Sequence, residues 1–438
     1  MLMSLVRGMA ARIGGRRNHD GRRGWKKAGG GRCVSLMARV ELLEGRCLLN
    51  ADHPVEGGAT QQADAMVAKQ AAPKAAAKKR IVYNGPITIT KGGVYSGNWQ
   101  SADANVPAVS VRTSDRVVIQ NSNIKSQGTL IDALGFAVNL TVKNNAGYAL
   151  NPNVVGRYPG RFMDIDGFTN VAVSNNYLQG TSGIYLYNYQ GNHTKQQTVR
   201  VLKNQARNID GRFSNGNGGF LTGHGENYFV QFFQINGVQG LVGAEVAWNE
   251  VINQPYKSRV EENISIHASG GTALSPFSIH DNYIQGAYPA DPVNDLVYRG
   301  GGIMMSDNGS SYVRAYRNQI VATTNEGMTI SSGHDNAFFN NRILSSGLMP
   351  NGAPNLAQNV GAIIWNYNLE TTFTNNVGYN NLIGWMLNGD QNNAYVPDAA
   401  SWVNNKDYPG VVTQATEAAE YAGWVNKLAK SRVKIGVV

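Results

Sequence analysis

The seven residues SIHDNYI at 278–284 show the pattern that decides the fold: apolar residues lead to a polar residue, nearly always Asn, and one spacer separates it from another apolar residue. The pattern occurs nine times, and the other copies are VIQNSNI at 118–124, TVKNNAG at 141–147, VSNNYL at 173–178, RVLKNQA at 200–206, VAWNEV at 246–251, RAYRNQI at 314–320, FFNNRI at 338–343 and TFTNNV at 372–377. Anchoring each copy on its second polar residue gives the positions Ser122, Asn145, Asn176, Asn204, Asn249, Asn282, Asn318, Asn341 and Asn376.

The spacing of these anchors is typical of a solenoid. The anchors are 23, 31, 28, 45, 33, 36, 23 and 35 residues apart. A shortest spacing that recurs, with a variable excess elsewhere, indicates coils of fixed minimum length into which loops are inserted. Short stretches of alternating polarity such as ITIT at 87–90 and NLTVK at 139–143 lie between turn residues and indicate β-strands. The sequence therefore predicts an all-β fold, a right-handed parallel β-helix of about nine to eleven coils over residues 81–393.

The repeated Asn has a physical role in such a fold. Asn tolerates a left-handed backbone at a tight bend, and its amide can bond the amide of the next coil, so stacked copies form an internal ladder. The residues beside the anchors should then stack inside the solenoid. These inward positions are Val142, Val173, Val201, Ile279, Phe338 and Phe373.

The C-terminal region, 394–438, contains a different pattern. Residues 413–430 place an apolar face on a helix, which we expect to cap the last coil and cover its unpaired edges. The residues of that face are Ala418, Tyr421, Ala422, Val425 and Leu428.

Charge and cysteine separate the first 80 residues from the rest of the chain. The net charge of +10 belongs to residues 1–80, which hold 16 Lys/Arg and 6 Asp/Glu, whereas residues 81–438 hold 23 of each. A basic leader over 1–52, which carries Cys33 and Cys47, and an Ala/Lys/Gln-rich linker over 53–80 are therefore predicted. The neutral body argues against nucleic acid as a partner. Because no run of 18 apolar residues occurs, no membrane span is predicted.

Titratable side chains are concentrated between residues 241 and 308. In the segment ISIHA, alternation places Ile264 and Ile266 inside, so that Ser265, His267 and Ser269 project outward. A polyuronate lyase needs a base and a positive charge that neutralises the uronate carboxylate, whereas a hydrolase needs two carboxyl groups about 5 or 6.5–9.5 Å apart, for which Glu245 and Glu262 are the candidates. The candidate catalytic residues are Glu245, Lys257, Arg259, Glu262, His267 and His280. The candidate substrate-binding residues are Tyr185, Tyr187, Tyr256, Arg299 and Asp307.

Two alternatives stay open for these residues. Charged side chains on a β-helix surface are commonly solvated or paired across coils. The alternating tyrosines of GIYLYNYQG at 183–191 either contact sugar rings or form an interior stack. No metal ligands are identified, and calcium is left open as a cofactor.

Two resemblances add to this interpretation. Residues 44–51, Glu-Gly-Arg-Cys-Leu-Leu-Asn-Ala, resemble the LEPR-type sorting segment of exported bacterial proteins, with Gly45 and Asn50 replacing the usual Pro and Ser. Residues 81–393 resemble β-helix proteins of the pectate-lyase-like superfamily. Within them, NISIHASGGTALSPFSIHDNYIQGAYP at 263–289 and GGGIMMSDNG at 300–309 resemble a group of exported bacterial β-helix proteins. These resemblances imply a fold and export, but the sequence lacks the Asp-Pro-His-Asp motif of mannuronan epimerases and the paired Asp motifs of polygalacturonases.

The sequence thus predicts a secreted or cell-surface β-helix protein that binds or acts on a polysaccharide, with polyuronate lyase activity as the specific hypothesis. The alternative is a non-catalytic cell-surface protein that binds glycan or serves as a structural or adhesin module. The sequence does not predict the oligomeric state.

Overall fold

The computed structural model describes residues 81–438 with the exception of residue 298. The predicted leader over 1–52, including the LEPR-like segment, and the predicted linker over 53–80 lie outside the described residues. Within the described residues, no helix combines the length and the apolar character needed to cross a bilayer.

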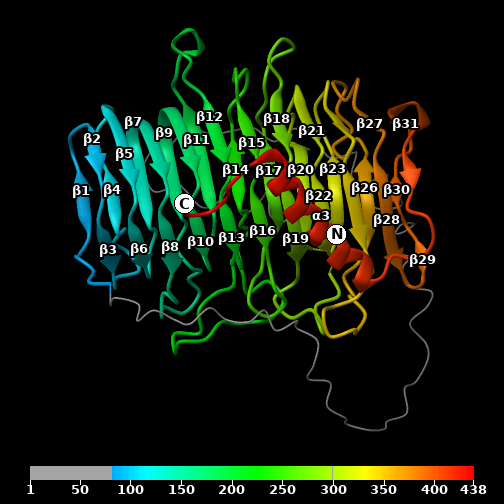
Figure 1. Cartoon of the computed structure of the whole chain (residues 1–438), viewed down its shortest axis with the longest axis horizontal. Coiled ribbons are helices and arrows are strands. Elements are labelled where there is room, and N and C mark those ends of the chain that lie inside the picture. The colour runs from blue at the N-terminus through cyan, green and yellow to red at the C-terminus, as the bar shows by residue number, and fades with distance from the viewer. Residues whose placement is uncertain (1–80, 298) are drawn as a thin grey trace, which may run out of the picture. The chain divides into compact units, whose positions relative to one another are not determined.

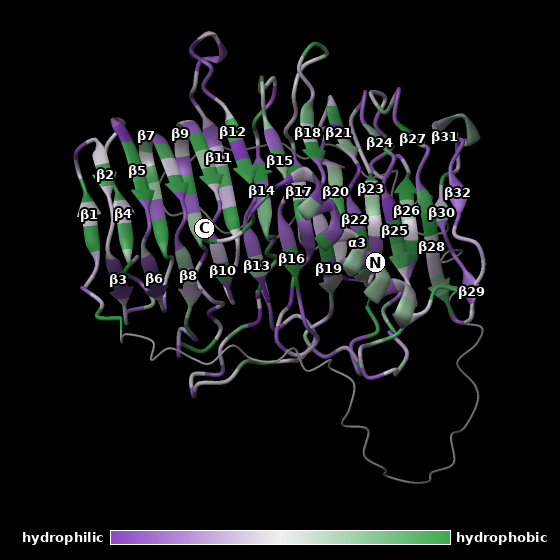
Figure 2. Cartoon of the chain, in the orientation of Figure 1, coloured by the Kyte–Doolittle hydropathy of each residue, from purple (hydrophilic) through white to green (hydrophobic). Residues whose placement is uncertain are grey.

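The described chain forms a parallel β-helix in which each coil adds one strand in turn to three parallel ladders (Figure 1). We call them the first, second and third ladders, in the order in which the chain passes through them. Each ladder contains eleven strands within the described residues, so the predicted β-helix of nine to eleven coils is confirmed. Hydrophobic residues are concentrated in these strands (Figure 2).

Two long strands, β7 (Ile131–Lys143) and β9 (Met163–Ser174), pass through both the first and the second ladder. The first ladder also contains β1 (Ile87–Ile89), β4 (Val109–Val111), β11 (Ile184–Tyr189), β14 (Phe233–Asn236), β17 (Glu262–His267), β20 (Gly301–Asp307), β23 (Glu326–Ile330), β26 (Val360–Ile364) and β30 (Ala394–Tyr395). The second also contains β2 (Gly93–Tyr95), β5 (Arg116–Gln120), β12 (Val199–Leu202), β15 (Glu245–Ala247), β18 (Phe277–His280), β21 (Val313–Tyr316), β24 (Ala337–Phe339), β27 (Val377–Tyr379) and β31 (Trp402–Val403).

The third ladder contains β3 (Asn98–Ser101), β6 (Asn123–Ser126), β8 (Ala146–Ala149), β10 (Tyr177–Gln179), β13 (Gln205–Arg207), β16 (Glu250–Ile252), β19 (Tyr283–Ala287), β22 (Gln319–Thr323), β25 (Arg342–Ser345), β28 (Leu382–Leu387) and β32 (Lys406–Asp407). The remaining elements are the short strand β29 (Asp390–Gln391), which is antiparallel to β28, two 3-10 turns, η1 (His193–Lys195) and η2 (Ala399–Ser401), and the helix α3 (Gln414–Ser431).

An asparagine ladder runs along the corner between the second and third ladders. The backbone N–H and the side-chain amide of Asn204 both donate to Asn249 Oδ1 at 3.0 Å, and Asn249 donates in the same way to Asn282. The residue before each ladder position has a left-handed backbone, as at Trp248 (φ 59°) and Asp281 (φ 51°). The turn therefore divides between two residues the roles that the sequence analysis gave to one: the first bends the chain and the Asn bonds the next coil.

The last predicted anchor, Asn376, was assigned to the wrong ladder. Asn341 donates to Asn381 instead, and Asn381 donates to Asn405. Asn376 accepts hydrogen bonds from Asn336 instead. These two residues form a separate, short asparagine ladder at the corner between the first and second strand ladders. The two corners need the same local geometry, and Asn375 before Asn376 is also left-handed (φ 55°), so the same motif serves both.

The core of the solenoid is built from columns of side chains in register. Val142, Val173 and Val201 follow one another in a single column and are fully buried. Ile279 and Phe338 continue the same column and are also fully buried. The predicted sixth member, Phe373, is only partly buried and does not belong to the column; Gly378 takes that place opposite Phe338. This error follows directly from the misplaced Asn376.

The predicted C-terminal helix is present as α3, which begins at Gln414 because the Thr413 side chain caps it by accepting from the backbone N–H of Thr416. Its place and its packed face differ from the expectation. The helix lies along strands of the third ladder rather than over the last coil (Figure 1), and its buried residues are Glu420 and Trp424. Of the expected apolar face, Leu428 is half-buried and the rest is exposed: Ala418, Tyr421, Ala422 and Val425.

Polar contacts fix α3 to the solenoid. Glu420 accepts hydrogen bonds from Arg342 Nε at 2.9–3.0 Å and from Gln319 Nε2 at 2.9 Å, and Trp424 Nε1 donates to Glu250 Oε2 at 2.8 Å. After the helix, the chain continues toward earlier coils, where Gly436 N donates to Lys203 O and Asn175 Nδ2 donates to Lys434 O. The docked face is therefore mixed: Glu420 makes the polar contacts, while Trp424 and Leu428 pack with a small apolar cluster on the solenoid that contains Tyr283, Val321 and Ala322.

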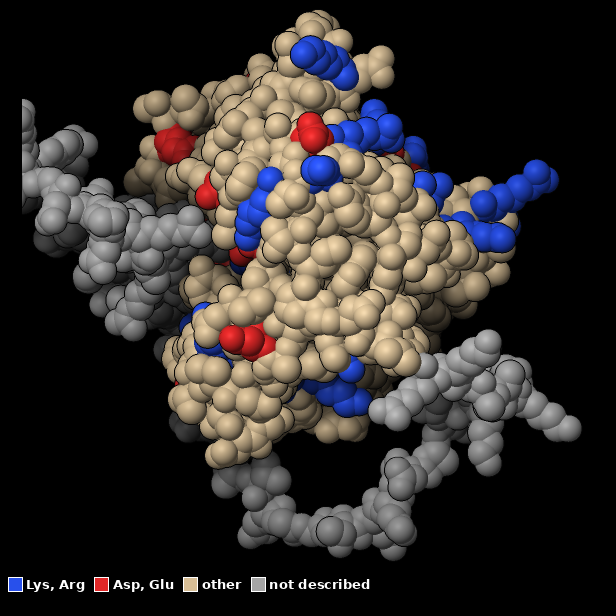
Figure 3. Space-filling view, turned by 90° about the vertical axis from the view of Figure 1, so that its left-hand side faces the viewer, with Lys and Arg blue, Asp and Glu red and all other residues tan. Residues whose placement is uncertain are grey.

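The first coil and the corner loops differ from the regular body. Val82 and Val94 of the first coil are exposed, and the end of the solenoid on which they lie shows mostly uncharged surface (Figure 3). The inserted loops gather at the corner where the chain leaves the third ladder and enters the first ladder of the next coil (Figure 1). We call this the third-to-first corner, and its longest loops are 150–162, 208–232, 253–261, 288–300 and 346–359.

Candidate functional site

The structure distributes the predicted site residues over three regions of the solenoid. Five lie on or beside strands of the first ladder: Tyr185, Tyr187, Glu262, His267 and Asp307. Two lie on the second ladder, Glu245 and His280. Four belong to the loops of the third-to-first corner: Tyr256, Lys257, Arg259 and Arg299.

The outer face of the first ladder carries the two tyrosines. Strand β11 alternates, so Ile184 and Leu186 are fully buried while Tyr187 is 42% exposed and Tyr185 is half-buried. The third tyrosine, Tyr189, follows a left-handed residue and packs against the core beside Phe168, with ring centroids 5.4 Å apart. The three tyrosines therefore do not all face the same way: the rings of Tyr185 and Tyr187 lie on the outside of the solenoid, and the ring of Tyr189 packs inward.

The outer face continues from these tyrosines to His267. In register along the ladder, Tyr187 is followed by Asn236, His267 and Asp307. His267 Nδ1 lies 2.8 Å from Asn236 Oδ1, and because an amide oxygen only accepts, Nδ1 carries the proton. The other ring nitrogen, Nε2, lies 3.7 Å from Asp307 Oδ2, and Asn236 Nδ2 donates to Tyr185 Oη at 3.2 Å.

This part of the face is more enclosed than the sequence predicted. Ser265, His267 and Ser269 were expected to project outward, but all three are buried, and His267 and Asp307 are each only 8% exposed. Ser269 is used by the turn that follows β17, where its Oγ donates to His267 O and accepts from Val238 N. Alternation gives the side of a strand correctly but not whether neighbouring coils cover it.

Glu262 lies at the start of β17, and the carboxyl group of Glu326, which the sequence analysis missed, lies close to it. Gln231 Nε2 lies 3.5 Å from Glu262 Oε2 and 2.8 Å from Glu261 Oε2. In register with Glu262 is Gly301, where an added Cβ would come within 2.3 Å of Glu326 Oε1. Glycine therefore leaves the space that the Glu326 carboxyl fills. Burial, and then the charge of Glu261, raises the pKa of Glu326 to about 8.

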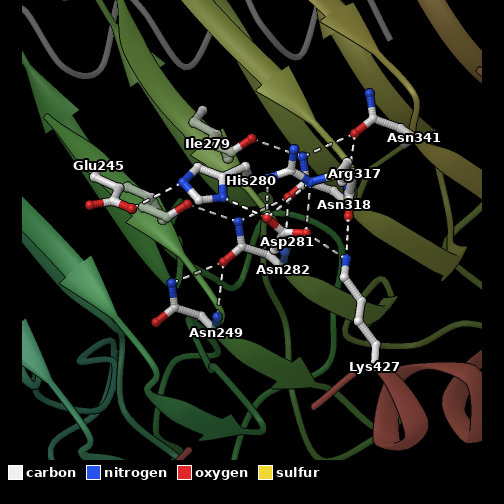
Figure 4. Close-up of polar contacts among 11 residues, drawn as sticks. Glu245, Asn249, Ile279, His280, Asp281, Asn282, Arg317, Asn318, Asn341 and Lys427 are labelled. Carbon is white, nitrogen blue, oxygen red and sulfur yellow. Dashed lines mark hydrogen bonds and ion pairs between the residues drawn. The ribbon is translucent and has the colours of Figure 1, made fainter. Parts of the chain in front are cut away.

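His280 lies on a different ladder and is held by carboxylates on both sides (Figure 4). Its Nδ1 is 2.7 Å from Asp281 Oδ2 and its Nε2 is 3.0 Å from Glu245 Oε1. Although burial disfavours the charged ring, these hydrogen bonds raise the pKa of His280, and the bond from His280 lowers the pKa of Glu245. Both ring nitrogens thus donate, and the ring also stacks on Tyr316 with centroids 4.8 Å apart.

Asp281 connects this cluster to α3. Arg317 donates to both of its carboxylate oxygens at 2.7–3.2 Å, and Lys427 Nζ lies 2.8 Å from Oδ1 (Figure 4). Despite burial, the hydrogen bonds from His280, Arg317 and Lys427 lower the pKa of Asp281. This arrangement fastens the helix and leaves no lone pair on His280 that could take a proton from a substrate. The candidates Glu245 and Glu262 lie on different ladders.

Arg259 and Arg299 come together at the third-to-first corner. Their guanidinium carbons lie 5.4 Å and 5.9 Å from the centroid of the same Phe229 ring. Arg259 is fully buried, and burial, followed by repulsion from Arg299, lowers its pKa to about 10. Arg299 reaches His224, with 3.4 Å between Nη2 and Nε2. An arginine without surface exposure has no direct access to a polymer on the outside.

Tyr256 and Lys257 line a separate hollow of about 350 Å³ at the same corner, together with Arg212 and Phe220. Both lie in the exposed loop between β16 and β17. Within residues 81–438, leaving aside 298, no three His, Cys, Asp or Glu side chains are grouped so that they could hold a metal ion. Calcium thus stays open as a cofactor.

The sequence matches no protein-family model and no curated protein. The function of this chain is therefore inferred from the geometry of its own surface.

Proposed function

We propose that this protein is a polysaccharide-binding β-helix that holds an extended glycan along the outer face of the first ladder. The observation that carries the proposal is the outward position of Tyr185 and Tyr187 in the same rows as Gln234 and Asn236. A sugar has apolar ring faces and a rim of hydroxyl groups, which aromatic rings and side-chain amides recognise together. Because the strands of a ladder repeat every ~4.8 Å, such a face offers regularly spaced polar groups to a regular polymer.

Binding is favoured over uronate cleavage by the places of the predicted catalytic residues. A lyase needs a base and a cation at one position. His280 donates from both nitrogens on the second ladder, and Arg259 is buried at the corner, so neither meets the first-ladder face in the required role. The carboxylates of Asp164 and Asp166 lie in the same rows as Tyr185 and Tyr187, which favours neutral sugars over acidic ones on this face, whereas the carboxylate of Asp132 is paired with Arg112.

A second candidate function is cleavage of the bound glycan at His267. The observation that favours it is the tautomer fixed by Asn236, which keeps the proton on Nδ1 and turns Nε2 toward Asp307. In this scheme Nε2 accepts the proton from the carbon next to a uronate carboxylate, a C=C bond forms as the bond to the neighbouring sugar's oxygen breaks, and water protonates that leaving oxygen; Asp307 stabilises the charged ring.

Membership of the pectate-lyase-like superfamily and placement outside the cell belong to the same proposal. The supporting observations are the parallel β-helix and the resemblance of residues 44–51 to a sorting segment. A glycan partner at the cell surface or in the surrounding medium is consistent with both.

The test is a binding screen of the full-length protein against neutral and acidic polysaccharides by affinity electrophoresis. We expect retardation by at least one neutral glycan and its loss in Tyr187→Ala. Tyr421→Ala, which removes a similarly exposed tyrosine from α3, is the matched control and should bind as the wild type does. Equal retardation of both variants would show that the first-ladder face is not the site.

The cleavage candidate needs a separate readout. Unsaturated sugar ends or new reducing ends are measured after incubation of the same glycans with wild type and His267→Ala. Products that disappear in this variant would establish catalysis at His267. Binding without products would leave the protein as a glycan-binding module.

A further inference from the structure

A groove beside α3 forms a hollow of about 580 Å³ on the third ladder. Its volume falls in the range of small-ligand pockets, about 300–1,000 Å³. Three cationic side chains, Arg317, Arg342 and Lys427, line it together with one carboxylate, Glu420. The residues that line it belong to α3 and to the third ladder with its adjoining turns, so this surface differs from the outer face of the first ladder.

Each of the two arginines is held by a carboxylate on one edge of its guanidinium group. Nε and Nη2 of Arg317 donate to Asp281 at 2.7–3.2 Å (Figure 4), and Nε and Nη2 of Arg342 donate to Glu420 at 2.5–3.0 Å. In both arginines, Nη1 makes no hydrogen bond to any residue from 81 to 438, with 298 left aside. The carboxylates therefore fix the two guanidinium groups at the hollow and leave donors of each for a ligand.

Lys427 adds a third cation and decides the sign of the charge around the hollow. Its Nζ donates to Arg317 O at 2.8 Å and lies 2.8 Å from Asp281 Oδ1, so one of its three N–H bonds remains for a ligand. The three cations of the hollow stand against two carboxylates, those of Asp281 and Glu420, which leaves one positive charge in excess. The hollow therefore favours an anion.

Small residues of α3 keep the hollow open. Ala419 and Gly423 line it, and Gly423 lies between Glu420 and Lys427 on the same side of the helix, because these positions are three and four residues away. A Cβ at Gly423 would find only Gln319 Nε2, at 3.7 Å, so packing does not require glycine there. Glycine in the middle of a helix disfavours the helix, and the space that it leaves lies between the cationic ends of the hollow.

We propose that this hollow binds a phosphate group, either as the free ion or as part of a small phosphate ester. The tetrahedral oxygens of a phosphate can accept from both Nη1 groups and from Lys427 at once, whereas a carboxylate has only two oxygens in one plane. Because Asp281 and Glu420 already hold the arginines, binding needs little further ordering of side chains. Asn340 and Tyr408, which also line the hollow, are available to the rest of an ester. The proposal goes beyond glycan binding at the first ladder and does not depend on it.

The test is isothermal titration calorimetry of the full-length protein with inorganic phosphate and with glycerol phosphate at low ionic strength. We expect at least one of the probes to bind, and the tighter one identifies whether the site takes the free ion or an ester. Arg342→Lys keeps a cation beside Glu420 but lacks Nη1, so it should raise the Kd about tenfold. Arg314→Lys, which changes a half-buried arginine of β21 away from the hollow, is the matched control and should bind as the wild type does.

A second pair of variants tests the hollow without changing a charge. Gly423→Leu places a side chain between the cations and should abolish phosphate binding, whereas Gly423→Ala should retain it. Both changes introduce good helix formers, so α3 should stay folded, which the melting temperature checks. The proposal is wrong if the wild type binds neither probe, if Arg314→Lys weakens binding as much as Arg342→Lys, or if Gly423→Leu binds phosphate as the wild type does.

Discussion

Replacing Asn249 by Ala tests the asparagine ladder at one of its fully buried positions. The side chain of Asn249 accepts two hydrogen bonds from Asn204 and donates to Val201 O at 2.8 Å and to Asn282 Oδ1 at 3.0 Å. All of these bonds are buried, so their former partners cannot turn to water. At about 1 kcal/mol for each of the four bonds, Asn249→Ala should lower the free energy of unfolding by about 4 kcal/mol.

The same substitution at the end of the ladder provides the control. Asn405 accepts two bonds from Asn381 and donates one to Gly378 O, but it is only half-buried, so water can replace part of what is lost. Asn405→Ala should therefore cost about 1 kcal/mol. Both variants are compared with the wild type by urea unfolding followed by circular dichroism, with the m value expected to stay unchanged. Equal losses in the two variants, or a loss below about 1 kcal/mol in Asn249→Ala, would refute the reasoning.

Three further predictions concern single sites. Gly301→Ala should lower the free energy of unfolding by about 2 kcal/mol, because its Cβ would come within 2.3 Å of Glu326 Oε1, whereas Gly85→Ala, with nothing within 4 Å, should be close to neutral in the same urea experiment. Raising the pH from 5 to 8 should destabilise the wild type through Glu326, by up to about 1.4 kcal/mol per pH unit. The reason is that the pKa of Glu326 is about 8 in the folded state against an ordinary value of 4.5, so that the folded state keeps a proton that the unfolded state has lost. An identical pH dependence of stability in the wild type and in Glu326→Gln would contradict this. Trp424→Ala removes a buried indole that donates a hydrogen bond to Glu250, and it should lower the free energy of unfolding by about 3–5 kcal/mol. It should also make the C-terminal helix accessible to limited proteolysis, and an unchanged digestion pattern would show that this residue does not hold α3 in place.

The regular part of the fold could be predicted from sequence because its cause is local and repeated. Nearly every copy of the motif supplies a left-handed residue, a ladder Asn and an inward apolar residue, so a single repeat is enough to predict the form of a coil. The motif does not state which corner it occupies, and that is why TFTNNV was assigned to the wrong ladder and Phe373 with it.

The site could be predicted only in part, because its surroundings come from distant segments. Strand alternation placed Tyr185 and Tyr187 on one face but left open whether that face is the outside, and the burial of His267 depends on neighbouring coils. Glu245 and His280 stood in one titratable segment with Glu262, yet the coil path carries them to a different ladder. For α3, the docked face was set by the surface beneath it, where Arg342 bonds Glu420 and a small apolar cluster receives Trp424.

The C-terminal segment 414–438, which contains α3, changes how stability is distributed along the axis of the solenoid. In a simple stack each coil touches only its neighbours, so an end can fray while the middle stays folded. Here Glu417 bonds Ser346 in a late coil, while Val438 N donates to Asn144 Oδ1 across 294 residues of sequence. Coils that never touch are therefore coupled, which converts a one-dimensional array into a unit that opens as a whole.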